Sequence, residues 1–305
     1  MAFFSVLAAV ALEQLRPLRY PLPHYRRYTL FIQWLERRFN AGEYVHGAIA
    51  WSLAVLPLLA AAWLIFALLD GISPFLGWMW NVAVLYFTLG FKYYSDNAER
   101  IANLLRAGDI EGARAQYSEW RGADASQFGA GEIARVTIEQ AIAASHRQMF
   151  GTLLWFVLLS PMGPAGAILF RAASILGRRW AGARGQFGAF SLRAFHVVNW
   201  LPARLTALTY AIAGNFEDAI YCWRTQADVW PEPEEGVVLA AGAGAMGVKL
   251  GESVTVSGAD LWRPDLGIGQ TPDADCIDSA ISMIWRGLAI WLAAGLLIVI
   301  AGWFA

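Results

Sequence analysis

Long apolar stretches separated by short polar ones are the main pattern of the chain. Residues 45–69 are apolar apart from His46, and they exceed the roughly 20 residues that a membrane-spanning helix needs. A charge-poor turn at 70–74 follows, and residues 75–91 are predicted to return through the bilayer. Residues 285–304 predict a final spanning helix. With the shorter apolar segments, we expect four or five spans.

Other apolar segments are shorter or interrupted. Residues 150–176 are broken by Ser-Pro-Met-Gly-Pro at 160–164, which a helix cannot continue through without a kink or reversal. This predicts a broken helix or a hairpin buried among other helices. In 197–213, Pro202 is expected in the first turn of a helix, where its missing N–H costs nothing. The glycines of 236–251 permit close helix contact.

Residues 92–148 are the most polar part and are predicted to form a small cytoplasmic helical portion. Helices are expected at 97–106 and 109–120, with Gly108 ending the first and Asp109 capping the second. The phrase at 214–219 resembles 108–113, which indicates the same helix–turn–helix used twice. The predicted fold is thus all-α: a polytopic integral membrane helical bundle, with residues 1–305 forming a single membrane-embedded domain.

Composition supports a membrane protein. The chain is 57% hydrophobic and 15% charged, whereas soluble domains have about 25% charged residues. A net charge of −1 without a strongly basic block argues against nucleic acid as a partner. Arginines dominate 16–38 and 178–193, which places these segments on the cytoplasmic side of a bacterial inner membrane. Two cysteines, Cys222 and Cys276, fit no metal-ligand spacing.

Few residues form a recognisable catalytic motif. Residues 242–247 match G-x-G-x-x-G by letters, but they lie in an alanine-rich apolar run rather than a β-α-β unit. The four histidines are far apart, and the acidic cluster at 232–235 is either a solvated loop or a site for a hydrated divalent ion. We therefore assign no catalytic residue and leave the metal ligands undetermined.

Arg204 is the most informative charge. It lies inside an apolar segment, where a charge has to be paired or face a water-filled pocket. Two interpretations stay open: an arginine that reaches the membrane surface, or a ligand for an anion or phosphate.

The phrase around Arg204 also carries a family resemblance. Trp-Leu-Pro-Ala-Arg-Leu-Thr-Ala-Leu at 200–208 and the alanine- and glycine-rich phrase at 240–251 resemble the CobD/CbiB family of membrane proteins. That family is linked to adenosylcobinamide-phosphate synthesis in cobalamin production. Further matching positions are the segment 164–171, Gly258, Arg263-Pro264, Leu266-Gly267, Gly269 and Asp275.

Several acidic positions of the synthases are replaced in this chain. Glu139 is kept, but the acidic and amide positions that follow it are Ala143, Ala144 and Arg147. Further replacements are Ser174, Gly177, Phe195-His196 and the segment 234–238. An ATP-dependent ligase needs acidic groups to hold Mg²⁺ over phosphates, so these replacements predict a retained scaffold with an emptied site. The chain also resembles the AmpE-type inner-membrane proteins, which open on a similar helix.

Two functional hypotheses follow. The first is a divergent family member without ligase activity or cofactor, a pseudoenzyme with an AmpE-like signalling or accessory role. It would bind an anionic or amphiphilic ligand, a corrinoid or a membrane protein partner in a pocket formed by Glu139, Arg147, Arg171, His196, Arg204 and Lys249. The alternative is a working adenosylcobinamide-phosphate synthase that joins an aminopropanol donor to adenosylcobyric acid with ATP and Mg²⁺. It would use the substitute acidic set Asp260, Asp265, Asp273, Asp275 and Asp278.

Overall fold

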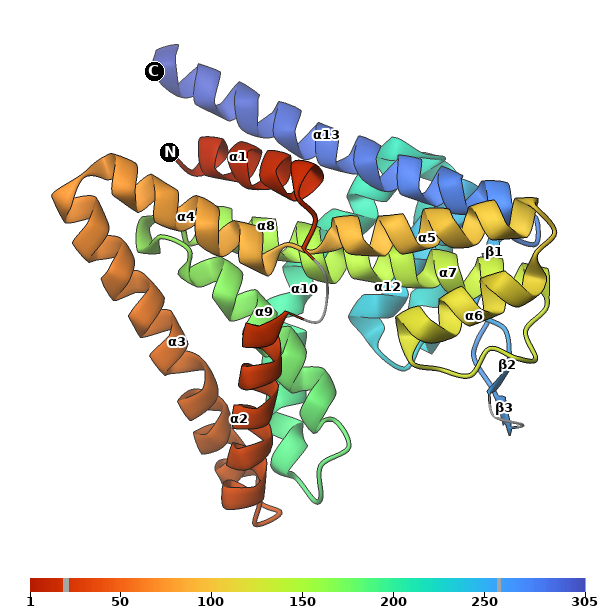
Figure 1. Ribbon diagram of the computed structural model, residues 1–305, viewed down its shortest axis with the longest axis horizontal. Coiled ribbons are helices and arrows are strands. Elements are labelled where there is room, and N and C mark those ends of the chain that lie inside the picture. Colours follow the sequence, from red (N-terminus) through yellow and green to blue (C-terminus); the bar gives the residue numbers. More distant parts are fainter. Residues whose placement is uncertain (19–21, 257–258, 305) are drawn as a thin grey trace. The chain divides into compact units, whose positions relative to one another are not determined.

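The computed structural model describes residues 1–18, 22–256 and 259–304, and it is almost entirely helical (Figure 1). This confirms the predicted all-α membrane fold. The chain divides into two compact units. The first unit comprises Met1–Gly90 and Arg147–Pro202, and the second comprises Phe91–His146 and Ala203–Ala305. That residues 1–305 form a single membrane-embedded domain stays a prediction.

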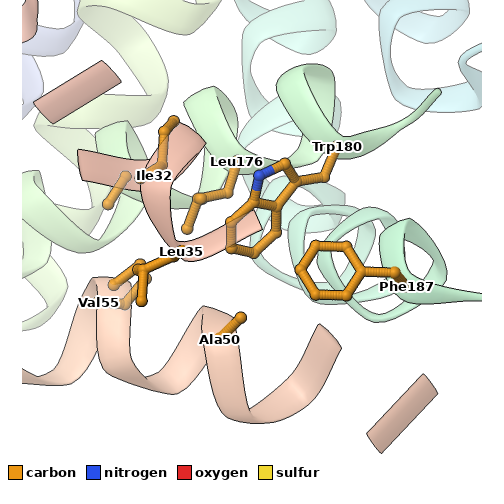
Figure 2. Packing of buried hydrophobic residues seen from close by; sticks show 9 residues of the cluster. Ile32, Leu35, Ala50, Val55, Leu176, Trp180 and Phe187 are labelled. Atoms are coloured by element: carbon orange, nitrogen blue, oxygen red, sulfur yellow. The ribbon is translucent and has the colours of Figure 1, made fainter. Parts of the chain in front are cut away.

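The first unit is built from helices packed on α3 and α9. Its elements are α1 (Ala2–Leu15), α2 (Pro23–Phe39), α3 (Tyr44–Ile72), α4 (Pro74–Thr88), most of the π-helical turn η1 (His146–Phe150), α8 (Gly151–Leu158), the 3₁₀ turn η2 (Ser160–Met162), α9 (Ala165–Trp180) and the first part of α10 (Phe187–Ala213). Figure 2 shows side chains of α2, α3, α9 and α10 meeting around Trp180, which is fully buried. This apolar cluster holds α2 against α3, α9 and α10.

The second unit combines helices with two small antiparallel sheets. Its helices are α5 (Phe91–Arg106), α6 (Ile110–Arg121), α7 (Ala130–Ser145), the remainder of α10, α11 (Phe216–Gln226), η3 (Ala227–Val229), α12 (Pro233–Met246) and α13 (Ala274–Phe304). Strand β1 (Lys249–Leu250) pairs with β4 (Leu266–Gly267), and β2 (Val254–Val256) pairs with β3 (Ala259–Leu261). The sheets bring the segment after α12 back against that helix.

Within the described residues, three helical stretches are long and apolar enough to cross a membrane: Tyr44–Ile72, Pro74–Arg106 and Ala274–Gly302. The first two contain the spans expected at 45–69 and 75–91, and the third overlaps the span expected at 285–304 but begins earlier. The number is lower than the four or five expected. The apolar stretch 150–176 is divided between two helices by the turn at 160–162, and α10 carries Arg193, His196 and Arg204 within its length.

The interrupted stretch 150–176 is a helical hairpin, as predicted. Helices α8 and α9 pack on each other, and the Pro-Met-Gly-Pro segment forms the 3₁₀ turn and reversal between them. A Cβ atom at Gly166 would lie 1.9 Å from the carbonyl oxygen of Trp155. The two backbones are therefore in contact at this position, and only glycine fits there.

The expectation that a helix starts at Pro202 was wrong, because Pro202 lies inside α10. Proline has no N–H, so the carbonyl group four residues earlier, at Val198, loses its helical donor. The indole Nε1 of Trp155 donates a hydrogen bond to that carbonyl oxygen at 2.9 Å. A side chain from α8 thus replaces the missing backbone hydrogen bond and allows α10 to continue.

The repeated helix–turn–helix phrase has the predicted local structure. Asp109 caps α6 by accepting from the Gly112 N–H at 2.8 Å, and Gly108 before it has φ = +74°. Asn215 caps α11 in the same way, by accepting from the Asp218 N–H at 3.2 Å. Gly242 and Gly244 of the G-x-G-x-x-G match lie in α12, and Gly247 directly follows it. Gly244 contacts the main chain of Asp218, so the glycine allows close helix packing.

Substitution of Gly166 by alanine tests the backbone contact in the α8–α9 hairpin. We expect the added methyl group to lower the free energy of unfolding by about 1–3 kcal/mol, because it overpacks a contact between two main chains. The matched control is Gly182→Ala, since a Cβ there meets nothing within 4 Å. Both are compared by thermal unfolding in detergent, and equal midpoints for the two variants would show that the hairpin is not closely packed.

Candidate functional site

Glu139 on α7 is the centre of a buried polar cluster in the second unit. Its side chain is 3% exposed. Its Oε2 atom accepts from Arg263 Nη1 at 2.5 Å, and its Oε1 atom accepts from the Gly251 N–H at 2.8 Å. Arg263 also donates from Nη2 to the Gly251 carbonyl oxygen at 2.9 Å. The Glu139 carboxylate thus binds the N–H of Gly251, and the Arg263 guanidinium binds the carbonyl oxygen of the same residue.

A second ion pair extends this cluster. Arg135, one turn before Glu139 on α7, is buried, pairs with Glu252 and donates to the Ser253 carbonyl oxygen at 3.2 Å. Glu252 has φ = +57°, a left-handed conformation that is unusual for a residue with a side chain. We call Arg135, Glu139, Glu252 and Arg263 the Glu139 cluster. It holds the main chain of 251–253 in a conformation that the chain alone disfavours.

The charges of the Glu139 cluster are balanced, with two arginines and two glutamates. Burial raises the pKa of Glu139, while the Arg263 guanidinium and the Gly251 N–H act in the opposite direction by stabilising the carboxylate. A buried carboxylate that is bonded on both oxygens suits a positioning role. It orders residues 251–253, which follow β1.

Arg171 on α9 is a buried cation in the first unit. Its Nε atom donates to the Tyr25 hydroxyl at 3.2 Å, and its Nη1 atom donates to the Arg147 carbonyl oxygen at 3.4 Å. The guanidinium carbon lies 5.2 Å from the centroid of the Tyr25 ring. Tyr25 in turn donates to the carbonyl oxygen of Phe87 at 3.2 Å. These contacts connect α9 to α2, α4 and the π-helical turn η1.

Arg171 also lines a cavity of about 330 Å³. The other lining residues come from α2, α3, α4 and α9 and are mostly apolar, including Leu58, Val84 and Ile168. A guanidinium in an apolar cavity can bind a carboxylate or phosphate group through two parallel hydrogen bonds. The cavity is therefore suited to an amphiphile that carries an anionic group.

The six residues predicted to share one pocket are divided between the units. Arg147, Arg171 and His196 belong to the first unit, where Arg171 contacts the Arg147 main chain and His196 is exposed. Glu139, Arg204 and Lys249 belong to the second unit, where Glu139 is buried, Arg204 half-buried and Lys249 exposed. The shared pocket stays a prediction.

Three of the substitute acidic residues are engaged in other contacts, namely Asp273, Asp275 and Asp278. Asp273 caps α13: its Oδ1 atom accepts from the N–H groups of Cys276 and Asp275, at 2.9 and 3.0 Å, and these bonds hold its pKa below the ordinary value. Asp275 and Asp278 both pair with Arg106. The Asp260 side chain lies outside the described part of the structure.

The described acidic residues form no cluster of protein ligands that would hold Mg²⁺ without substrate phosphates. Within the described part of the chain, no three His, Cys, Asp or Glu side chains are placed to hold a metal ion together. Glu234 and Glu235 lie in the first turn of α12, and Glu234 is buried. Negative charge is favoured there by the helix dipole. Cys222 and Cys276 are free thiols.

Sequence reasoning missed Arg135, Tyr25 and the role of Arg263. Arg263 was noted only as part of a family phrase, and its partner Glu139 is 124 positions away in the chain. No periodicity or motif spacing relates two residues at that separation. The signal that did exist was the spacing of Arg135 and Glu139, which lie four positions apart and so share one face of α7. Charges buried on a helix face need partners.

Comparison with known proteins gives one consistent result. The chain matches the family described as CobD/Cbib protein over residues 6–284. It is 36% identical to a cobalamin biosynthesis protein CobD from Stutzerimonas stutzeri, over 99% of this chain and 98% of that one. It is 36% identical to a CobD from Chromobacterium violaceum over 83% and 79% of the two chains. It is 28% identical to a CbiB from Salmonella typhimurium over 92% and 90%. No solved structure matched the chain.

These matches overturn the hypothesis of a pseudoenzyme with an AmpE-like role. Proteins similar to the chain over its full length are named for cobalamin biosynthesis, which supports the synthase alternative. The absence of several acidic side chains removes one way of holding a cation. It does not show that the activity is absent, and the inference from lost acids to lost function was wrong.

Replacing Glu139 by alanine tests the Glu139 cluster. The change removes the carboxylate that pairs with the partly buried Arg263 and accepts from the Gly251 N–H, so we expect the free energy of unfolding to fall by about 3 kcal/mol. We also expect faster hydrogen exchange at the Gly251 amide, which donates to Glu139. Glu119→Ala on the exposed face of α6 is the control and should change stability little. Unchanged protection of Gly251 would contradict the role given to Glu139.

Proposed function

Because the chain belongs to the CobD/CbiB family, we propose that it is an adenosylcobinamide-phosphate synthase of cobalamin biosynthesis. The reaction joins the amine of an aminopropanol donor to a carboxylate of adenosylcobyric acid and forms an amide bond. The observation that carries the proposal is the 36% identity to a protein named CobD over nearly the whole length of both chains. A shared fold alone would be weaker support.

The cavity at Arg171 supports the proposal. Carboxylates and phosphates are the anionic groups of the proposed substrates, and a guanidinium binds both through paired hydrogen bonds. We propose that Arg171 holds one such group while the apolar walls exclude water. Arg147, His196, Arg204 and Lys249 remain proposed ligand contacts, and Glu139 positions the chain around Gly251.

An amide bond does not form in water from a carboxylate and an ammonium group without activation. ATP is therefore the proposed co-substrate, with Mg²⁺ accompanying its phosphates. The described acidic side chains do not assemble a protein site for the cation. We assign no step of the reaction to it.

We propose that the protein crosses the bacterial inner membrane several times. Three helical stretches of the described chain have the length and composition of spans. Arginines follow α1, end α2 and end α9, in keeping with a cytoplasmic location for these ends. The lipid bilayer is then a permanent partner, and a corrinoid is the proposed ligand.

A complementation assay tests the proposed activity. The full chain is expressed in a strain that lacks its own synthase and is supplied with cobyric acid and an aminopropanol donor. We expect cobinamide formation to be restored. Absence of cobinamide, from protein shown to be folded and in the membrane, would contradict the synthase function.

The same assay tests whether Asp275 acts in the reaction. Asp275 is exposed and pairs with Arg106 at the surface, where such ion pairs contribute little to stability. We expect Asp275→Asn to retain cobinamide formation within about a factor of two, with the wild-type chain assayed in parallel. A large loss at an unchanged protein level would show that this carboxylate contacts the substrate or a cation.

A further inference from the structure

An arginine-rich groove lies at one end of the first unit, away from the cavity at Arg171. It has a volume of about 690 Å³, and its lining residues include Arg37, Arg179 and Arg184. Glu36 is the one acidic residue among the described lining residues. We call this set the arginine groove. Three guanidinium groups against one carboxylate give the arginine groove a positive charge.

The arginine groove is formed where α2 and α9 end. Arg37 lies in the last turn of α2 and Arg179 in the last turn of α9. The loops that follow these helices cross each other: the Gln186 N–H donates to the Gly42 carbonyl oxygen at 2.8 Å. Gly185 has φ = +64°, and a Cβ there would lie 2.5 Å from the same oxygen. This close crossing fixes the loops and preforms the groove.

The arginine groove lies at the level where a membrane-spanning helix begins. Helix α3 starts at Tyr44, directly after the crossing at Gly42. Val45 and Ile49, in its first turns, are 63% and 44% exposed, as expected for side chains that face lipid. A groove next to the first turn of a span is at the height of the lipid headgroups.

Helix α2, which supplies one wall, has the character of an interfacial helix. Its Ile32 and Leu35 side chains are buried in the cluster of Figure 2, while Leu30, Phe31 and Trp34 are exposed. The rings of Phe31 and Trp34 stack with centroids 6.1 Å apart. Exposed aromatic groups on a helix that also carries arginines are typical of helices that lie at the membrane surface.

We propose that the arginine groove binds the phosphate of an anionic phospholipid headgroup. The positive charge selects an anion, and Arg37, Arg179 and Arg184 can each donate paired hydrogen bonds to phosphate oxygens. The exposed apolar side chains of α2 and α3 provide surface for the acyl chains. A soluble phosphate ion would use only the positive charge and not the exposed apolar side chains. The presence of both features favours a lipid as the occupant.

Lipid retention by the full-length protein tests this proposal. The chain is purified in a neutral detergent, and bound lipid is counted by native mass spectrometry after addition of phosphatidylglycerol or phosphatidylcholine. We expect phosphatidylglycerol to be retained preferentially. In Arg179→Gln/Arg184→Gln, its apparent affinity should fall on the order of tenfold.

Matched variants separate charge from packing. Arg121→Gln/Arg224→Gln removes two exposed arginines from α6 and α11, and it should bind phosphatidylglycerol like the wild type. Arg179→Lys/Arg184→Lys keeps the charge and should retain most of the binding. Equal affinity in all variants, or equal retention of phosphatidylcholine, would overturn the proposal. Displacement of the lipid by millimolar inorganic phosphate would identify a soluble anion as the ligand instead, and would overturn it as well.

Discussion

Close contact between main chains at glycines is the constraint on which the helix packing of both units depends. Gly166 brings α9 against α8 in the first unit, and Gly47 brings α3 against the main chain of Phe187. Gly244 brings α12 against the start of α11 in the second unit. Apolar side chains give little drive for association between helices that share a lipid environment, so small residues that let backbones approach become decisive.

The two buried charge centres suit different roles. The Glu139 cluster pairs two glutamates with two arginines and contacts the main chain of 251–253, so it fixes a segment that the family resemblance includes. Arg171 instead contacts a hydroxyl and a carbonyl group and borders a cavity. The first arrangement is suited to ordering the protein, and the second to holding an anionic group of a ligand.

The sequence predicted the elements better than the site. Apolar runs are long enough to identify the helices containing 45–69 and 285–304, and the prolines at 161 and 164 identify the hairpin, because these signals are local. Pro202 was misjudged because its replacement donor, Trp155, comes from another helix. Arg263 was not connected with Glu139 for the same reason. The function was misjudged because the replacement of individual acidic residues was given more weight than the similarity of the whole chain to the family.

The α8–α9 hairpin has a consequence for how the protein enters the membrane. Helix α9 has 16 residues, so it is about 24 Å long. It does not span a hydrocarbon core of about 30 Å by itself. The hairpin packs along α3, from Gly163 in the turn against Phe66 to Trp180 of α9 near Ala50. Because α3 and α4 precede the hairpin in the chain, they are synthesised first, and α9 packs against helices that already exist when it is made.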